Sequence, residues 1–467
     1  MNILFVSWEV DPFFKVGGLG DIARSLPKAL HNKNIDISLA VPLYDAVKFH
    51  GQETTEVGQV SIVYDGKKIT FHIIKTTFPD VNIPIYFFKN KKYLSIPMAD
   101  TFAVFNMAII ESIRMNTLQK PDIIHCNDNH AGFIPLLVKH HNLPIKTLLT
   151  IHNLNNFGRA GINQVIKMGI DPNMCTVLKW EIQKRQINFL LEGIVHADKV
   201  NAVSETYAKE ILTEEYGSGI DEVLTGLSNK ITGILNGIDY EVRNPTNDTY
   251  LKYTYDIKAS GNLFDITKGK ANNKAYLQKK LKYDIDSNIP LIGFIGRFDS
   301  KQKGVQLLHR VINRIDKKKY QFVVLGTGEP NWEERYLWLS QFYKNVYYKN
   351  VFDEELASQM YAGCDFLIIP SKFEPCGLIQ MIAMRYGCIP IARATGGLKD
   401  TIRDGDTGFL FEEYTSTALE NTLIKAATLF RTDKDAFASM RIRAMKEDFS
   451  WNQSAEKYIK LYKELLG

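Results

Sequence analysis

Residues 2–21 read NILFVSWEVDPFFKVGGLGD, a strand-like run that leads into a glycine turn. Residues 2–8 are mostly apolar, as in a strand buried on both faces of a parallel sheet. The turn at residues 15–21 leads into the helical pattern IARSLPKALHNK. A short apolar run, a glycine turn and a helix in this order predict the first βα unit of a doubly wound domain.

The same alternation of strand-like runs and helical patterns continues in two series. The runs of the first series after residue 8 are DISLAVP (36–42), PDIIHC (121–126), KTLLTIHN (146–153), KVNAVS (199–204) and KITGILN (230–236). Those of the second are LIGFIGR (291–297), QFVVLGTG (321–328), NVYYKNV (345–351), DFLIIPS (365–371) and CIPIARA (388–394). A polar stretch, 241–289, separates the series. We therefore expect an α/β protein with two Rossmann-like domains that face each other.

Composition narrows the range of partners. The chain has 467 residues and a net charge of +5 that is spread over many short stretches, which argues against nucleic acid as a partner. Five cysteines without C-x-x-C spacing argue against disulfides and zinc, and favour a cytoplasmic location. The acidic residues Glu9 and Asp11 follow the N-terminal apolar run closely, so we interpret this run as a strand, not a signal peptide. No apolar run approaches the length needed to span a membrane.

Ligands of open parallel sheets bind beyond the carboxyl ends of the strands, so the residues that follow each run are the candidates for a site. The strand-like runs are followed by Glu9 and Lys15, Asp128, His152, Arg297 and Glu374. Asp128 suits a hydrogen bond to a hydroxyl group, whereas we expect His130 to begin a helix and pack. A lone histidine such as His152 is more often structural than catalytic, but its strand-end position favours function.

The turn around Lys15 has two interpretations. The pattern Gly18-x-Gly20-x-x-Ala23 matches a relaxed dinucleotide fingerprint, which would suggest an NAD-dependent oxidoreductase. A true fingerprint follows its strand directly, and here about eight residues intervene. The alternative is an anion site in which the amides of Gly17 and Gly18 act together with the Lys15 ammonium. We favour the anion site over the nicotinamide interpretation.

Two segments of the second series offer charge for a diphosphate. GRFDSKQKG carries Arg297 and Lys303, which either clamp a diphosphate or belong to a solvated loop. SKFEPCGLIQ is expected to open a helix whose first amides, at Gly377, Leu378 and Ile379, attract an anion. Glu374 either favours the helix dipole or contacts a sugar ring that develops oxocarbenium character. The glycines of TGGLKD (395–400) are expected to let the backbone approach the same diphosphate region.

Two D-x-D patterns, at residues 284–286 and 404–406, resemble the metal-binding signature of some sugar transferases. Aspartate and glycine favour turns for local reasons, so we interpret both patterns as chance. Without a metal, the charge of a leaving diphosphate is left to lysine, arginine and helix ends. We therefore expect neither a metal nor another cofactor.

Taken together, these motifs resemble the bacterial glycogen synthase and plant starch synthase family. The segments that carry the resemblance are SWEVDPFFKVGGLGD (7–21), HCNDNHAG (125–132), IHN (151–153), NAVSETYAKEI (201–211), LNGID (235–239), GRFDSKQKG (296–304), LGTGEP (325–330), SKFEPCGLIQ (371–380) and TGGLKDTI (395–402). They follow the family order over nearly the whole chain. The resemblance implies a GT-B fold with two Rossmann-like domains across a cleft, residues 1–240 joined by the C-terminal helix 450–467, and residues 241–449.

The resemblance also implies a reaction: glucose passes from a nucleotide-glucose, ADP-glucose before UDP-glucose, to the non-reducing 4-hydroxyl of an α-1,4-glucan, with retention. A phosphate oxygen would take the acceptor's proton, and the attack would come from the face that the diphosphate leaves. The catalytic residues would be Glu374, His152, Lys303 and Arg297. The donor would contact Lys15, Gly18, Asn236, Arg297, Lys303, Phe352, Cys376, Gly377, Leu378 and Ile379. The acceptor would contact Glu9 and Asp128, and no metal would bind.

Four positions depart from the family pattern, and they concern nucleobase preference more than the reaction. Asn129 stands where tryptophan is usual, Asn156 where tyrosine is usual, Phe352 where tyrosine is frequent, and Ile379 where threonine or asparagine is common. Two further functions stay open. One is a GT-B transferase that makes a small glucoside or disaccharide, although Ile382 stands where many such relatives carry a second glutamate. The other is an inactive glucan-binding relative.

Overall fold

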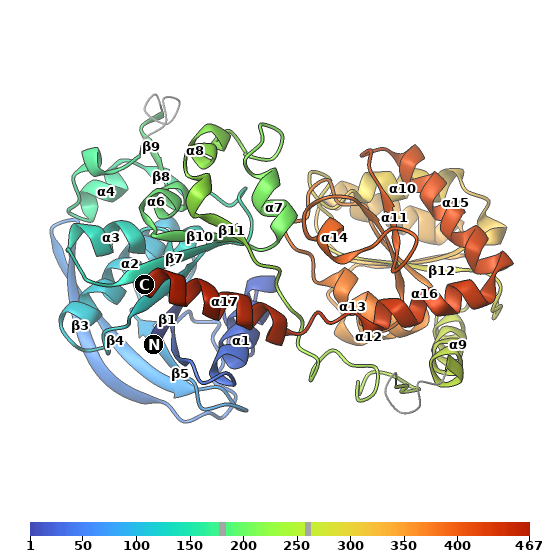
Figure 1. Cartoon of the computed structure of the whole chain (residues 1–467), viewed down its shortest axis with the longest axis horizontal. Coiled ribbons are helices and arrows are strands. Elements are labelled where there is room, and N and C mark those ends of the chain that lie inside the picture. Colours follow the sequence, from blue (N-terminus) through green and yellow to red (C-terminus); the bar gives the residue numbers. More distant parts are fainter. Residues whose placement is uncertain (177–183, 257–262) are drawn as a thin grey trace. The chain divides into compact units, whose positions relative to one another are not determined.

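The computed structural model describes residues 1–176, 184–256 and 263–467. They divide into two compact units (Figure 1). Unit 1 comprises Met1–Asn236 and Trp451–Gly467, and unit 2 comprises Gly237–Ser450. Each unit contains a sheet with parallel strands, which confirms the predicted α/β class with two doubly wound domains. None of the helices in the described ranges is long and apolar enough to cross a membrane.

In the described part of unit 1, nine strands form one sheet in the order β11-β10-β7-β6-β1-β2-β5-β4-β3. Their bounds are β1 Asn2–Val6, β2 Asp36–Pro42, β3 Thr55–Tyr64, β4 Lys67–Thr77, β5 Pro84–Lys89, β6 Ile123–Asn127, β7 Lys146–Ile151, β10 Lys199–Ala202 and β11 Ile231–Gly233. The pairs from β11 to β5 are parallel, and β4 pairs antiparallel with both β5 and β3. A separate antiparallel pair joins β8 (Arg159–Gly161) to β9 (Gln186–Asn188).

The hairpin β3–β4 extends the sheet beyond the strands that the apolar runs predicted. Its turn is Asp65-Gly66, and both residues have positive φ angles, 52° and 68°. Two such residues in a row are typical of a tight hairpin turn. The dipeptide Asp-Gly between alternating strands was thus the signal that could have located this hairpin.

The helices of unit 1 connect and cover these strands. Their bounds are α1 Gly18–His31, α2 Ala99–Arg114, α3 Ile134–His140, α4 Asn163–Lys167, α6 Phe189–His196, α7 Glu205–Glu210, α8 Asp221–Gly226 and α17 Trp451–Leu466, with 3-10 turns η1 Asn129–Ala131, η2 Pro172–Met174 and η3 Ser228–Lys230. The helical patterns after the glycine turn and at the C-terminus are therefore confirmed as α1 and α17.

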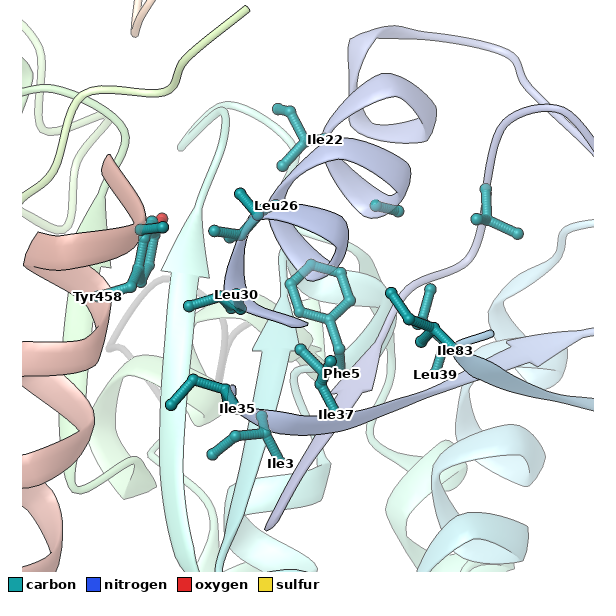
Figure 2. Packing of buried hydrophobic residues seen from close by; sticks show 14 of the residues in the cluster. Ile3, Phe5, Ile22, Leu26, Leu30, Ile35, Ile37, Leu39, Ile83 and Tyr458 are labelled. Atoms are coloured by element: carbon teal, nitrogen blue, oxygen red, sulfur yellow. The ribbon is translucent and has the colours of Figure 1, made fainter. Parts of the chain in front are cut away.

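The core that fixes the start of the chain lies between α1 and the sheet. Figure 2 shows Ile22, Leu26 and Leu30 along one side of α1, in the same buried cluster as Phe5 and Ile37 of the central strands. Their spacing of four residues places them on one face of the helix. Burial of these side chains contributes about 1.5–3 kcal/mol each. This packing holds the carboxyl end of β1 and the turn that follows it against the sheet.

Helix α17 closes the same core from the far end of the chain. Trp451, Tyr458 and Tyr462 belong to the buried cluster beside α1. The Tyr462 hydroxyl lies 2.8 Å from Nδ1 of His125 in β6, and the Tyr458 hydroxyl accepts a hydrogen bond of 2.9 Å from Nδ2 of Asn201 in β10. Since these partners are buried, the last helix is part of the packing of unit 1.

In the described part of unit 2, six parallel strands form a sheet in the order β14-β13-β12-β15-β16-β17. The strands are β12 Leu291–Ile295, β13 Gln321–Leu325, β14 Val346–Lys349, β15 Phe366–Ile369, β16 Ile389–Arg393 and β17 Phe409–Phe411. The helices are α9 Leu263–Lys280, α10 Val305–Arg314, α11 Pro330–Phe342, α12 Glu354–Gly363, α13 Ile379–Arg385, α14 Gly396–Thr401, α15 Ser416–Thr432 and α16 Lys434–Lys446, with the 3-10 turn η4 Lys317–Lys319. The second series of strand-like runs is thereby confirmed.

Candidate active site

The loop after β1 is held by a carboxylate of the protein itself. Glu9 is 1% exposed, and its Oε2 accepts hydrogen bonds from the amides of Val16 and Gly17, the second at 2.9 Å. Burial raises the pKa of Glu9 above its usual range. The Gly17 amide was expected to bind an external anion. In this structure it binds Glu9 instead, because the loop folds back over the end of its own strand.

Lys15 lies on this loop and pairs within unit 1. Its ammonium Nζ is 2.7 Å from Oδ1 of Asp21, one turn into α1. Helix α1 begins at Gly18, which is exposed, with Gly17 as its N-cap residue. The glycine turn therefore opens a helix, as predicted. The roles of Lys15 and Gly18 in donor binding remain predictions.

The ends of β6 and β7 bring Asp128 and His152 together. Oδ1 of Asp128 accepts hydrogen bonds from the backbone amides of His152 at 2.7 Å and of Asn153 at 3.4 Å. Burial raises the pKa of Asp128 to about 7 and lowers that of His152 to about 3. The imidazole of His152 is therefore neutral at physiological pH. It can orient a substrate through hydrogen bonds, but it brings no positive charge of its own.

His130 was expected to begin a helix and pack. It is the second residue of the 3-10 turn η1, which begins at Asn129, and it stacks on Trp8 with ring centroids 4.7 Å apart, so the predicted packing is confirmed. Beside this stack lies a cavity of about 510 Å³ whose walls include Trp8, Asn129 and Asn156. Asn129 is 6% exposed, and its Oδ1 has no hydrogen-bond partner among the described residues. Two positions that depart from the family pattern thus share one polar cavity within unit 1.

Asn236 follows β11 at the end of the first segment of unit 1. It is 2% exposed, and its Oδ1 has no hydrogen-bond partner within the described part of the chain. A buried acceptor without a partner costs free energy, about 1–3 kcal/mol. A hydroxyl group that donated to this oxygen would relieve the cost.

Unit 2 forms an ion pair between Lys303 and Glu374. The Lys303 ammonium lies 2.9 Å from Oε1 and 2.7 Å from Oε2 of Glu374, although 71 residues separate them. The hydroxyl of Ser371 donates to Oε2 of the same carboxylate at 2.8 Å. The side chain of Glu374 is 8% exposed and that of Lys303 is 20% exposed. The loop after β12 and the loop after β15 thus meet at one charged cluster.

Gln302 connects Arg297 to this cluster. Its Oε1 accepts a hydrogen bond of 3.3 Å from Nη2 of Arg297, and its carbonyl accepts one of 2.7 Å from the amide of Lys372. Gly304, next to Lys303, has a φ of +67°, and a Cβ there would lie 2.0 Å from the carbonyl oxygen of Pro370. Sequence reasoning missed Gln302 and Ser371. The only signal for them in the sequence is that Gln302 lies next to Lys303 and Ser371 lies three residues before Glu374.

The segment after Glu374 makes a tight turn into α13. Gly377 has a φ of +72°, Leu378 is the N-cap residue, and the helix begins at Ile379 and ends at Arg385. Nε2 of Gln380 donates to the carbonyls of Cys376 at 2.9 Å and Gly377 at 2.8 Å. Gln380 therefore braces the turn that carries the predicted donor residues, a role that the sequence did not indicate.

The second glycine turn packs against that segment. A Cβ on Gly397 would lie 2.0 Å from the carbonyl oxygen of Cys376, and the Gly397 amide donates a hydrogen bond of 3.0 Å to the carbonyl of Glu374. The glycines of TGGLKD were expected to allow approach to a diphosphate. The approach seen here is to residues 374–376, because β16 runs beside β15 and brings the two loops together.

Phe352 lies in the turn between β14 and α12 and is 77% exposed. Such exposure is unusual for a phenyl ring and leaves its face open to a flat partner. Its contact with a nucleobase stays a prediction.

Within the described ranges, no group of three or more histidine, cysteine, aspartate or glutamate side chains could hold a metal ion. Both aspartates of the D-x-D pattern at 404–406 make contacts within unit 2: Asp406 pairs with Arg403 and Arg443, and Asp404 accepts a hydrogen bond from the Leu410 amide. The interpretation of this pattern as a turn is confirmed. The absence of a metal requirement remains an expectation.

Comparison with known proteins covers both units. Residues 2–226 match the family model of the starch synthase catalytic domain, and residues 289–428 match that of glycosyl transferases group 1. The chain is 38% identical to the glycogen synthase of Kosmotoga olearia over 482 residues, covering 100% of this chain and 98% of that one. It is 39% identical to the glycogen synthase of Geotalea daltonii over 496 residues, covering 100% and 99%.

Among solved structures, the catalytic domain of starch synthase IV from Arabidopsis thaliana, bound to ADP and acarbose, matches with a TM-score of 0.89. Identity is 31%, and the match covers 100% of this chain and 99% of that one.

Proposed function

Since the chain belongs to the glycogen and starch synthase family and has its GT-B fold, we propose that it transfers glucose from a nucleotide-glucose to the non-reducing end of an α-1,4-glucan, with retention of configuration. It is a glycosyltransferase of the glycogen biosynthesis class. The observation that carries the proposal is the charged cluster of unit 2. There Glu374 holds the Lys303 ammonium and accepts from the Ser371 hydroxyl, while Arg297 donates to Gln302, the neighbour of Lys303.

A leaving nucleoside diphosphate needs positive charge that is already in position. Preorganised cations stabilise charge that develops in the transition state more than mobile ones do, because they need no reorientation. We assign this task to Lys303 and Arg297, together with Lys15 of unit 1. Glu374 holds Lys303 in place, and its negative charge favours the oxocarbenium character of the sugar ring.

The glucosyl group needs partners for its hydroxyls. We assign the neutral imidazole of His152 and the unpartnered oxygen of Asn236 to hydrogen bonds with these hydroxyls. Cys376, Gly377, Leu378 and Ile379 form the turn that we expect to line the donor, and Gly18 opens the helix next to Lys15.

Asp128 is the proposed acceptor for a hydrogen bond from a glucan hydroxyl. Its carboxyl group is protonated at low pH and negatively charged above about pH 7. Glu9 fixes the loop that follows it and is the second residue that we propose to contact the acceptor. The cavity beside Trp8 offers room for a further sugar unit of the glucan. The acceptor's proton passes to an oxygen of the departing diphosphate, on the face where the new bond forms.

We further propose ADP-glucose as the preferred donor, with the exposed ring of Phe352 against the adenine. The solved starch synthase IV contains ADP, which supports this choice. No metal is required in this scheme. A cytoplasmic location fits five cysteines that form no disulfide among the described residues, Cys126, Cys175, Cys364, Cys376 and Cys388.

The test is incubation of the protein with glycogen and either ADP-glucose or UDP-glucose, in buffer with EDTA. We expect nucleoside diphosphate release, a longer glucan, and new linkages with the α configuration in the proton NMR spectrum. Faster turnover with ADP-glucose supports the donor assignment. Products found only with free glucose as acceptor would instead indicate a disaccharide-forming enzyme, and no turnover with either donor would contradict the proposal.

A further inference from the structure

A chain of hydrogen bonds in unit 1 ends on His152. Nδ2 of Asn127 donates to the carbonyl of Val6 at 2.9 Å, which links the ends of β6 and β1. Oδ1 of Asn127 lies 2.9 Å from Nε2 of His152, at the end of β7. Asn127 is 1% exposed, so water does not compete for these contacts.

The direction of each hydrogen bond follows from the first. A carbonyl oxygen only accepts, so the amide nitrogen of Asn127 must face Val6. The amide oxygen then faces His152, and since this oxygen also only accepts, Nε2 of His152 must carry the proton. A neutral imidazole has one N–H group, so its Nδ1 carries a lone pair.

That lone pair accepts no hydrogen bond from the described residues. Nδ1 of His152 is buried and lacks a hydrogen-bond partner there. His125, two residues before Asn127, is different: its Nδ1 contacts the Tyr462 hydroxyl and its Nε2 contacts the Thr150 hydroxyl, each at 2.8 Å. A buried acceptor without a partner is costly, and such groups in native proteins call for a functional explanation.

We propose that Asn127 is a positioning residue that holds His152 in the Nε2–H tautomer, so that Nδ1 accepts a hydrogen bond from a sugar hydroxyl of the substrate. The identity of the hydroxyl-bearing ligand rests on the proposed function, whereas the tautomer is a property of the protein alone. Burial supports the same state, because it lowers the pKa of His152 and keeps the ring neutral.

Two substitutions separate this role from simple packing. Asn127→Asp places a carboxylate oxygen beside Nε2, which stabilises the imidazolium and protonates Nδ1. Nδ1 then no longer accepts, and we expect kcat to fall about 100-fold. Asn127→Leu keeps the branched shape and the number of heavy atoms but removes the acceptor for Nε2–H. We expect about a 10-fold fall in kcat from it, because the ring loses its fixed orientation.

The decisive readout is the nitrogen NMR spectrum of the full-length protein labelled at its histidine rings, with His152→Gln used to assign the signal. In the unsubstituted protein at neutral pH we expect Nε2 to be protonated and Nδ1 unprotonated. Asn127→Asp should convert His152 to the doubly protonated form. Asn201→Leu is the matched control: it removes another buried amide of the same sheet, bonded to Tyr458, and should leave the His152 signal unchanged.

The outcomes distinguish this inference from the proposed function. A protonated Nδ1 in the unsubstituted protein, or an Asn127→Leu variant with an unchanged ring signal and unchanged kcat, would overturn the inference. If the Asn127 variants do not fold, the spectrum of the unsubstituted protein still decides the tautomer. Absence of glucosyl transfer alongside the expected spectrum would count against the function and leave the positioning of His152 standing.

Discussion

The polar groups at the strand ends of the two units differ in how they are held. In unit 1, Asp128 is buried and His152 is partly buried, and loss of solvation shifts both pKa values toward the neutral forms, to about 7 and about 3. In unit 2, Lys303 and Glu374 form an ion pair within 2.7 Å. Both arrangements lie beyond the carboxyl ends of parallel strands. The first pair therefore offers neutral hydrogen-bonding groups, and the second pair offers charged side chains.

The difference follows from what each set of partners offers. Backbone amides surround the carboxylates of unit 1: Glu9 accepts from Gly17, and Asp128 accepts from His152. Amides stabilise a carboxylate locally but supply no full positive charge. Unit 2 supplies side-chain cations, which can act on a diphosphate group. If this comparison is right, substitutions in unit 2 should act on catalysis first, and those in unit 1 on protonation and geometry.

The largest effect is expected from Lys303→Met. Loss of a preorganised cation at developing charge lowers kcat by about 100- to 1,000-fold. Glu374 would also be left as a buried carboxylate without its ion-pair partner. Initial rates with saturating donor and glycogen measure the effect. Lys301→Met is the control, because Lys301 is exposed in the same loop and should retain nearly full activity. A Lys303→Met variant as active as the control would contradict the proposed electrostatic role of Lys303 in unit 2.

The next effect concerns Asp128 and pH. Its pKa is about 7 in the folded protein, above the value near 3.9 of an unfolded chain. Its stabilising contribution is therefore complete below pH 4 and is lost as pH rises through 7. Between pH 5 and pH 8 the unfolding free energy should fall by about 2–3 kcal/mol relative to an Asp128→Asn variant.

Urea unfolding of both proteins at the two pH values measures this difference. The substitution keeps Oδ1 as acceptor for the amides of His152 and Asn153. If both proteins show the same pH dependence, the pKa of Asp128 is not raised by folding. The carboxyl group would then be charged, not neutral, below pH 7.

A third effect tests whether the loops of unit 2 depend on close backbone packing. In Gly397→Ala the added methyl group would meet the carbonyl oxygen of Cys376 at 2.0 Å. Backbone cannot give way as a flexible side chain can, so we expect a loss of about 1–3 kcal/mol in unfolding free energy. Thermal unfolding measures it. Gly161→Ala meets nothing within 4 Å and should change stability little. Equal melting temperatures for the two variants would contradict the packing role.

The smallest effect is expected from Phe352→Ala. Because the ring is 77% exposed, its removal should leave stability nearly unchanged. Loss of stacking on the base should raise the donor KM about 10-fold. Phe342→Ala removes another exposed ring of unit 2, 63% exposed, and should leave the donor KM unchanged. Identical donor KM values in both variants would exclude Phe352 from the base site.

Much of this molecule could be predicted from residue patterns. Apolar runs located the parallel strands except β5 and β17, and the amphipathic pattern of residues 451–466 located α17. The strand-end rule selected Asp128 and His152, which lie in contact, and Lys303 and Glu374, which form a pair. These successes share a cause: periodicity and the geometry of parallel sheets are local or topological properties.

What escaped prediction depends on the path of loops. Nothing in the sequence indicated that Glu9 would accept the Gly17 amide, or that Gly397 would pack against Cys376. Gln302 and Ser371 brace the charged cluster, and Gln380 braces the turn that precedes α13. Such partners are set by three-dimensional loop conformation, which residue type and spacing leave undetermined.

The position of α17 has a consequence for the order of folding. Unit 1 is made from the first 236 residues and the last 17, while unit 2 is one continuous segment between them. During synthesis the chain of unit 2 is complete before unit 1 receives Trp451, Tyr458 and Tyr462. Until then the core beside α1 stays open to water, and His125 lacks its tyrosine partner. During synthesis the packing of unit 1 is therefore unfinished until α17 has left the ribosome.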